Sequence, residues 1–545
     1  MRQRRATLVV AAGVAGAIAV VAPSTAATAP TFTGPSRADN PAISAVNGQK
    51  YVNEPATVVG GDGTRYVAYQ RDSQLSKTTN GGRTWTYVGG QDVLTKNVSG
   101  CMPLTDIGDV DLTVDKAGQV YFADLQGTAG PQADTGIQAV VAHSGDGFRT
   151  YSGTCAAHQV ASVDREWLAA YTAPNKTALG SDVYLSYHDF GPNYISVNAS
   201  HDGGRTFGLP VPVLDNPGAN LASGCDTVPA GTAVDPRNGW VYVAWTSGPN
   251  PVFNSTTGCN YTQGTVFNKF WVAVSKDHGK LGSFHTTLAV ETPDQTDLTK
   301  PSDMSEIFGS IAVDRQGGVY IAYTGFNQRH QEYDVFVTHS APADASGALH
   351  FRDDGSGTAK VNQVSFLPAE TAYFPRLIAG DRGRIDLIYL GTRVINVPAT
   401  AANKANPMYN GSNPGKPNCR PEITDPLQKG FRFIGKPCEL PADAAWYITL
   451  AQSLNAAGSA PTWTRNRLRP DPVHMGDICT LGIFCLGGDN RDLGDVNDIK
   501  IDASGGAQVA YTYETPTGSR TEIDFQCQQS GPGLYAGISV TPCRR

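Results

Sequence analysis

The amino-acid sequence predicts an all-β fold for this chain of 545 residues. Two short motifs recur in phase along the chain, and each stands next to runs of strand-forming residues. The composition agrees, because 60 glycines and 35 prolines indicate many turns, and charged residues make up only 17% of the chain. Repetition at a fixed structural position indicates a repeat architecture.

The first motif reads S-x-D-G-G-x-T-F at residues 200–207, directly after an extended run. A short carboxylate such as Asp202 can accept backbone N–H groups ahead of it, and the two glycines allow positive φ. Variants of the motif stand at residues 78–85, 144–151 and 275–284, and residues 453–463 keep only its ends. We therefore expect structural turns, not catalytic sites, at Asn80, Asp146, Asp202 and Asp277.

The second motif reads roughly D-x-x-G followed by an alternating strand, and an apolar strand precedes each copy. Its copies are residues 62–69, 115–123, 182–187, 235–245, 314–323, 381–389 and 502–511. The repeating unit is therefore four strands, A to D, and seven such units predict a β-propeller with four-stranded blades. Six blades are the alternative, because the seventh unit lacks the first motif and an N-terminal strand can complete it.

The meander places the loops on two faces of the propeller. Turns between strands A and B and between C and D share one face, and both short motifs lie in them. Loops between B and C and between D and A share the other face, which receives the long insertions at residues 124–136, 247–264, 394–444 and 467–495. We expect function on this second face, because binding residues are commonly held on loops by a rigid scaffold.

The two ends of the chain differ in character. Residues 1–29 read as an export signal, with Arg2, Arg4 and Arg5 before an apolar run and small residues at a cleavage site. Residues 30–50 are expected to form a flexible mature N-terminus, and residues 51–545 a single propeller domain with long disulfide-stapled loops. No later run is long and apolar enough to span a membrane, so we expect a secreted, monomeric protein.

Ten cysteines in an exported chain favour disulfides over metal thiolates. Pairing between sequence neighbours gives 101–155, 225–259, 419–438, 479–485 and 527–543. The net charge of −7 argues against a nucleic-acid partner.

The copies of the first motif resemble the Asp-box (BNR) repeats of sialidase-like propellers, and with the D-x-x-G strands the resemblance covers nearly the whole mature chain. It implies a propeller that acts on or binds glycans, with the Asp-box turns opposite the active site. Sialidases also carry an F/Y-R-I-P motif near the first blade, whereas residues 51–55 here read Y-V-N-E-P. One of the three arginines that hold the substrate carboxylate in that family is therefore absent.

Candidate catalytic residues follow from what glycoside hydrolysis needs, which is two carboxylates or, in sialidases, a tyrosine nucleophile. Acids at the start of strand A point toward the central funnel: Asp109, Asp111, Asp164, Glu166, Asp303, Glu306, Asp495 and Asp498. We expect Tyr373 and Glu306 to form the nucleophile and its base, with Asp189 or Glu166 as the acid. The alternative is that the acids solvate the funnel or bind a structural Ca²⁺; no other cofactor and no catalytic metal is expected.

Substrate-holding arginines are predicted at Arg165, Arg329 and Arg376, and the alternative is that they pair with nearby acids. The sequence thus favours a secreted sialidase-like exo-glycosidase that acts on a glycan or glycoconjugate. A propeller that binds glycan or protein without turnover is the alternative, and a glycan lyase fits the same loops.

Overall fold

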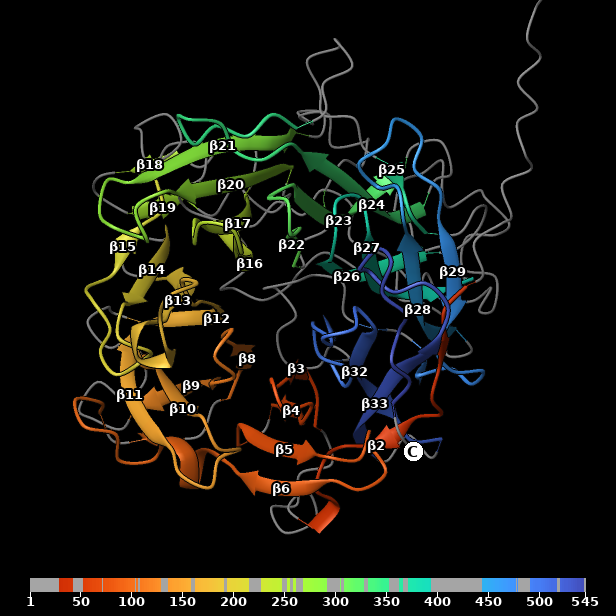
Figure 1. Ribbon diagram of the computed structural model, residues 1–545, viewed down its shortest axis with the longest axis horizontal. Helices are drawn as coiled ribbons and strands as arrows, with labels where there is room; N and C mark the ends of the chain where they lie inside the picture. The colour runs from red at the N-terminus through yellow and green to blue at the C-terminus, as the bar shows by residue number, and fades with distance from the viewer. Residues whose placement is uncertain are drawn as a thin grey trace, which may run out of the picture.

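A computed structural model gives the structure of the chain. It describes residues 29–42, 52–70, 72–102, 104–105, 108–128, 136–157, 162–190, 194–214, 227–247, 252–254, 258–260, 268–291, 304, 308–327, 332–351, 362–365, 371–393, 444–476, 478, 491–516 and 520–543. These residues form seven antiparallel blades arranged in a ring, with the first strand of each blade nearest the axis (Figure 1). The predicted seven-bladed propeller is confirmed, and the six-bladed alternative is excluded.

The first three blades follow the predicted A-to-D meander. From the axis outward their strands are β3 (Ala56–Val59), β4 (Arg65–Tyr69), β5 (Gln74–Thr78) and β6 (Thr86–Gly89) in blade 1; β8 (Val110–Val114), β9 (Val120–Thr128), β10 (Ile137–Ser144) and β11 (Ser152–Ala157) in blade 2, where β7 (Leu104–Thr105) also pairs with β9; and β12 (Val163–Tyr171), β13 (Asp182–Asp189), β14 (Tyr194–Ser200) and β15 (Val211–Pro212) in blade 3. The short helical turns η1 (Gln91–Thr95) and η2 (Ala178–Gly180) lie between strands.

The next three blades repeat this order. Their strands are β16 (Thr227–Val234), β17 (Val241–Ser247), β20 (Lys269–Ser275) and β21 (Phe284–Glu291) in blade 4; β22 (Ser310–Val313), β23 (Val319–Asn327), β24 (Glu332–Ser340) and β25 (Asn362–Gln363) in blade 5; and β26 (Thr371–Ala379), β27 (Ile385–Thr392), β28 (Ala445–Ser453) and β29 (Thr464–Arg467) in blade 6, where β30 (His474–Met475) also pairs with β28. The pair β18 (Val252–Asn254) and β19 (Gly258–Asn260) forms a separate hairpin.

Blade 7 joins the two ends of the described chain. It consists of β31 (Asp498–Ile501), β32 (Ala507–Glu514) and β33 (Thr521–Ser530), and its outer edge is completed by β1 (Thr31–Phe32) and β2 (Ser36–Arg37). The propeller therefore begins before residue 51, and the expected flexible segment 30–50 contains two strands of the last blade. The reason is that β33 alone would leave a row of unpaired N–H and C=O groups at the edge of the sheet.

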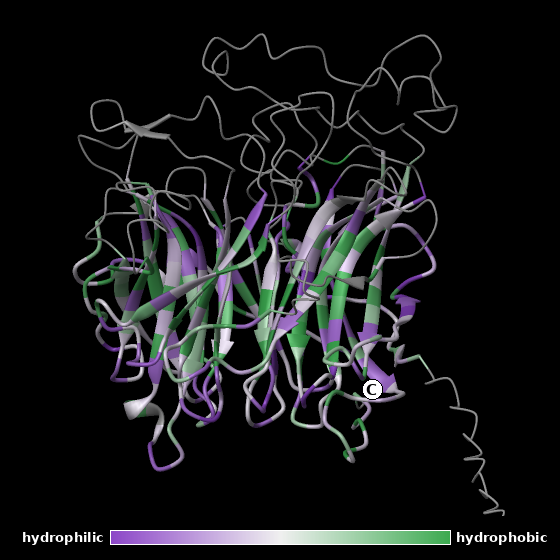
Figure 2. Ribbon diagram, turned by 90° about the horizontal axis from the view of Figure 1, so that it is seen from above, coloured by the Kyte–Doolittle hydropathy of each residue, from purple (hydrophilic) through white to green (hydrophobic). Residues whose placement is uncertain are grey.

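The hydrophobic core is divided into seven clusters, one between each pair of neighbouring blades. Successive side chains of a strand point to opposite faces, so one strand serves two clusters. In β9, for example, Phe122 packs toward blade 1 and Tyr121 toward blade 3. Figure 2 shows the blades from the side, with hydrophobic residues along the strands that cross the body.

The copies of the first motif form tight turns held by one repeated hydrogen-bond pattern. The Ser200 hydroxyl accepts the Gly204 N–H at 2.9 Å, and the Asp202 carboxylate accepts the Thr206 N–H and hydroxyl at 2.9 and 2.7 Å. Both glycines have positive φ, 73° and 84°. Asn80, Asp146 and Asn455 accept from the corresponding threonines, so the degenerate copy at 453–463 keeps the network.

Two copies depart from this pattern where the sequence loses a glycine. Phe148 and His278 occupy the left-handed positions instead, with φ of 62° and 52°. In the copy around His278, the Ser275 hydroxyl still accepts the Gly279 N–H, but the Asp277 carboxylate contacts Lys280 at 3.4 Å.

The D-x-x-G turns contact the next blade on the same face as the first motif. The Asp115 carboxylate accepts the Gln119 N–H at 2.9 Å and the Ser181 hydroxyl of blade 3 at 2.7 Å. The Gln119 side chain donates to the Gly203 carbonyl at 2.9 Å. These contacts confirm that both short motifs share one face.

Two of the five predicted disulfides lie within the described residues, Cys101–Cys155 and Cys527–Cys543, and both are formed as neighbour pairing predicts. The pairs 225–259, 419–438 and 479–485 depend on residues outside the described part of the chain. Over the described residues, the helices are too short and too polar to cross a bilayer.

We predict that Asp202→Ala lowers the free energy of unfolding by about 1–2 kcal/mol, because the Thr206 N–H and hydroxyl lose their acceptor. Asp202→Asn is the matched control, because Asn80 already fills this role in blade 1. Thermal unfolding measures both variants. Equal losses for Ala and Asn, or a loss of ligand affinity in a folded Asp202→Ala protein, would contradict the structural role.

Candidate functional site

The first strands of the blades bring a cluster of charged residues to the axis of the propeller. Glu54 precedes β3 in blade 1, Asp109 precedes β8 in blade 2, Arg165 lies in β12 of blade 3, and Arg491 and Asp495 precede β31 in blade 7. We call these five residues the axis network. Because strand A begins on the face of the B–C and D–A loops, the network lies opposite the short motifs.

Arg165 is the centre of the axis network. Its Nη1 lies 2.6 Å from Glu54 Oε2 and 3.3 Å from Asp109 Oδ2, although the residue is only 5% exposed. Burial lowers the pKa of Arg165, but the carboxylates of Glu54 and Asp109 outweigh this effect and raise it overall. The guanidinium therefore stays charged in a site where an unpaired charge would be costly.

Glu54 connects Arg165 to blade 7. Its Oε1 accepts the Asp495 N–H at 3.1 Å and lies 3.7 Å from Arg491 Nη2, and Arg491 also forms an ion pair with Asp495. Gly494 packs so closely that an added Cβ would lie 2.3 Å from Glu54 Cγ. Charges thus alternate from Asp109 through Arg165, Glu54 and Arg491 to Asp495.

Strained backbone accompanies these contacts. Glu54, Arg165 and Phe374 have positive φ values of 49°, 54° and 58°, which non-glycine residues rarely adopt. In β12 the strain coincides with a break in the register between Asp164 and Trp167, and in β26 with a break between Tyr373 and Arg376. Such conformations cost about 1–3 kcal/mol each and gather at functional sites.

Two further carboxyl groups near the axis, Glu166 and Asp164, have raised pKa values. Neither oxygen of Glu166, a residue only 2% exposed, has a hydrogen-bond partner among the described residues. Burial and the nearby Asp109 carboxylate raise the pKa of Glu166 well above its usual value. The same two causes raise the pKa of Asp164 to about 7.

A shallow pocket, here called the axis pocket, lies beside the axis network; its empty space is about 200 Å³ when the open mouth is included, and its enclosed part has room for about one water molecule. Its described lining is Trp167, Phe308, Gly309, Phe374, Pro375, Arg376, Asp495, Val496 and Asn497. Arg376 reaches across the axis from blade 6, so that its guanidinium carbon lies 4.0 Å from the centre of the Trp167 ring. Arg376 Nε lies 3.1 Å from Asp498 Oδ1, and Lys500 Nζ is also 3.1 Å from this carboxylate.

Asp495 is the carboxyl group in this described lining. Burial and the Glu54 carboxylate raise the pKa of Asp495 to about 7, against the opposing effect of Arg491. Three residues later, burial of Asp498 is outweighed by Lys500 and Arg376, so the pKa of Asp498 is lowered. Two carboxyl groups at the start of one strand therefore differ in protonation near neutral pH.

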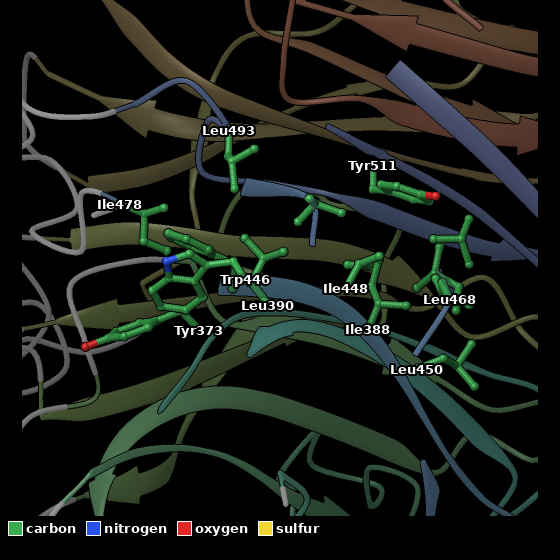
Figure 3. Packing of buried hydrophobic residues seen from close by; sticks show 14 of the residues in the cluster. Tyr373, Ile388, Leu390, Trp446, Ile448, Leu450, Leu468, Ile478, Leu493 and Tyr511 are labelled. Carbon is green, nitrogen blue, oxygen red and sulfur yellow. The ribbon is translucent and has the colours of Figure 1, made fainter. Parts of the chain in front are cut away.

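The predicted nucleophile, Tyr373, is part of the core between blades 6 and 7. The residue is 1% exposed, and its ring centre lies 5.2 Å from that of Tyr333 and 6.2 Å from that of Trp446. Figure 3 shows Tyr373 packed beside Trp446 in this cluster. Its neighbour Phe374, not Tyr373, lines the pocket.

The other predicted site residues are distributed as follows. Arg165 and Arg376 come together at Trp167, but each has an internal carboxylate partner, as the alternative prediction proposed. Asp189 is buried at the end of β13 and does not belong to the described lining of the pocket. Glu306 and Arg329 lie outside the described residues, so the pairing of Glu306 with Tyr373 stays a prediction.

His188, next to Asp189, is a neutral histidine. Burial lowers its pKa to about 4, and its ring centre lies 4.6 Å from that of Phe190. Within the described residues, no group of three His, Cys, Asp or Glu side chains is placed to hold a metal ion. The Ca²⁺ suggested for the funnel stays a prediction.

Sequence reasoning missed Glu54, Arg491 and Trp167 as site residues, and it named Asp495 only among the funnel acids. Residues 51–55 drew attention for the arginine that they lack. The signal that could have identified Glu54 is its position directly before the first strand A, which places it at the axis. Arg491 belongs to a long insertion, where no repeat position indicates a direction.

No protein-family model and no curated protein sequence matches this chain. Among solved structures, a protein of unknown function from Dyadobacter fermentans is 12% identical with a TM-score of 0.41, covering 91% of this chain and 98% of its own. An ulvan lyase of polysaccharide lyase family PL25 is 13% identical with a TM-score of 0.45, covering 92% and 96%. A Trypanosoma rangeli sialidase is 12% identical with a TM-score of 0.34, covering 68% and 58%. All three TM-scores lie below 0.5, so these likenesses carry no argument about function.

We predict that Asp495→Asn makes stability less dependent on pH between about 4 and 7. A raised carboxyl pKa means that the folded protein holds a proton that the unfolded chain releases, so this group lowers stability as the pH rises through that window. The Asn variant removes this effect. Between about pH 4 and 7 its free energy of unfolding should therefore fall less than that of the wild type, and the two falls should differ by about 1 kcal/mol or more. Denaturant titrations at several pH values measure the difference.

The control is Asp471→Asn, because the Asp471 side chain is 74% exposed and lies outside the axis network. It should leave the pH dependence as it is in the wild type. If the free energy of unfolding depends on pH more steeply in Asp495→Asn than in the wild type, the proton released on unfolding does not come from Asp495.

Proposed function

We propose that this chain is a glycan-acting propeller that hydrolyses glycosidic bonds in the axis pocket, with Asp495 as the proton-transferring carboxyl group. The observation that carries the proposal is the position of Asp495, which lines the pocket and has a pKa raised to about 7. A general acid works best when its pKa lies near the working pH.

The lining suits a sugar ring. Phe308, which is only partly buried, offers an aromatic ring against which the C–H groups of a sugar can pack, and Arg376 and Asn497 offer hydrogen bonds for its hydroxyl groups. Asp498 holds Arg376 in place through its ion pair. Paired environments that move two carboxyl pKa values apart are typical of acid–base sites.

In the reaction, Asp495 gives its proton to the leaving glycosidic oxygen as the bond to the anomeric carbon breaks. Water then adds to that carbon, and its proton returns to the Asp495 carboxylate. The sequence predicted Glu306 as the base of a Tyr373 nucleophile, and here Glu306 is proposed instead as the second carboxylate that hydrolysis needs. Glu166 is the competing proton donor, because it too is held in its neutral form.

The finer, sialidase-like form of this proposal uses Tyr373 as the nucleophile, and the burial of Tyr373 gives that form no support. Export is proposed on the two disulfides, since such bonds persist in oxidising compartments. A monomer and a glycan or glycoconjugate substrate complete the proposal.

A second candidate function is glycan binding without turnover. The alternating ion pairs of the axis network favour it, because they occupy charged groups that catalysis would need free. This reading keeps the pocket and its aromatic lining but assigns no reactive role to Asp495.

The test is a panel of fluorogenic aryl glycosides with the wild type, Asp495→Asn and Glu166→Gln. We predict turnover that Asp495→Asn lowers by a factor of about 10² to 10⁴, the usual contribution of a general acid. Glycosides with a good leaving group, such as dinitrophenyl, should partly restore the rate, because their departure needs no proton.

The matched control is Asp471→Asn, which should retain the wild-type rate. If only Glu166→Gln loses activity and responds to the leaving group, the donor is Glu166. Retention on a glycan array without release from any glycoside would favour the binding protein and contradict hydrolysis.

A further inference from the structure

We infer that Glu54 determines the charge of the ligand in the axis pocket: by occupying Arg165 and Arg491, it makes the site select uncharged glycans over glycans that carry carboxylate or sulfate. This inference deepens the proposed function and rests on the axis pocket being the glycan site. It assigns Glu54 a specificity-determining role that does not require contact with the reacting atoms.

The first argument is that the guanidinium groups at the axis already have anionic partners. Glu54 lies 2.6 Å from Arg165 and 3.7 Å from Arg491, and Asp109 takes a further contact with Arg165. A ligand carboxylate at Arg165, which is 5% exposed, would compete with Glu54 and Asp109, whereas the half-exposed side chain of Arg491 is already shared by Glu54 and Asp495. Such an exchange gives no net gain, because a buried carboxylate would lose its partner.

The second argument concerns Arg376, the arginine in the described pocket lining. Its charge is balanced by Asp498, and its guanidinium is stacked on the Trp167 ring. Asp498 in turn also binds Lys500. Arg376 can therefore donate to a sugar hydroxyl, while its charge is partly balanced by the Asp498 carboxylate that it shares with Lys500.

The third argument is the charge balance around the axis. Among the described residues around the axis, the carboxyl groups outnumber the cationic groups, seven to four: Glu54, Asp109, Asp111, Asp164, Glu166, Asp495 and Asp498 against Arg165, Arg376, Arg491 and Lys500. Burial and neighbouring carboxylates already raise the pKa of Asp164, Glu166 and Asp495, so the site takes up protons to limit its negative charge. With these three groups protonated the described charges are balanced, four against four, so an entering anion would add a net negative charge and an uncharged sugar would not.

The backbone around Glu54 supports a dedicated role. Glu54 is 4% exposed and holds a left-handed conformation. Its carboxylate also receives the N–H of Asp495, and Gly494 leaves no room for a side chain beside it. The chain therefore fixes this carboxylate in one position between the two arginines.

The experiment uses matched pairs of aryl glycosides, a glucoside with a glucuronide and a galactoside with a galacturonide. Turnover and binding are both measured, binding by competition or calorimetry. We expect the wild type to prefer the uncharged member of a pair by about tenfold or more, because like charges in one site disfavour association. Glu54→Gln keeps the shape of the side chain and removes one negative charge from beside Arg165 and Arg491, so it should shift this ratio toward the acidic member by about tenfold.

Two further variants keep the result interpretable. Glu522→Gln removes an ion pair with Arg37 in blade 7, 2.9 Å in the wild type, and should leave the ratio unchanged. If Glu54→Gln does not fold, Asp109→Asn removes the other partner of Arg165 and should shift the ratio in the same direction. The readout is the ratio of the values measured for the two glycosides of a pair, because general destabilisation lowers turnover or binding of both glycosides alike.

The inference is overturned if the wild type accepts acidic and uncharged members equally, if folded Glu54→Gln leaves the ratio unmoved, or if no glycan binds. Selective binding of uncharged glycans without turnover would contradict the hydrolase and support the role of Glu54. Turnover with a preference for acidic glycans would support the hydrolase and refute the role of Glu54.

Discussion

The buried ion pair between Arg165 and Glu54 is the interaction on which the centre of this propeller depends. Blades of a propeller pack mainly against their neighbours, but this pair joins blade 3 to blade 1, and Glu54 continues the contact to blade 7. Removing one partner of a buried ion pair costs about 3–5 kcal/mol, because the other charge remains without compensation. The pair therefore fixes the starts of several inner strands relative to one another.

Several departures from ordinary backbone geometry lie at the same place. Three left-handed non-glycine residues, two register breaks and a buried carboxyl group without a described hydrogen-bond partner lie around one axis. Breaks in register and left-handed residues also occur in other strands and loops, as between Phe270 and Trp271 and at Asp72, while Asp115 and Asp202 close their turns in the expected way. Proteins usually accept such local costs at functional sites, which is why the chemistry is assigned to the axis and not to the turns.

The fold was predictable because the same turn motifs and alternating strands recur from blade to blade. Asp202 and its counterparts mark the positions of the turns, and the alternating pattern of each strand shows which of its side chains are buried. Even the degenerate copy at residues 453–463 could therefore be assigned to a turn. The site was less predictable, because it depends on contacts between residues far apart in the sequence. Nothing local to Glu54 indicates Arg165 as its partner. Tyr373 and Phe374 are adjacent in the sequence, yet Tyr373 packs in the core and Phe374 lines the pocket, beside a break in the register of β26 that the sequence does not reveal.

The pairing of β1 with β33 in blade 7 also has a consequence for the order in which the chain folds. Thr31 and Ser530 share a side-chain hydrogen bond across 499 positions, so β1 is synthesised long before β33, the strand that it pairs with. Until the two strands pair, the outer edge of β33 is open to other strands, and a chain held in this state is exposed to pairing with a second copy. Closure of the ring is therefore a late, long-range step, and the time before closure is when aggregation competes most strongly with folding.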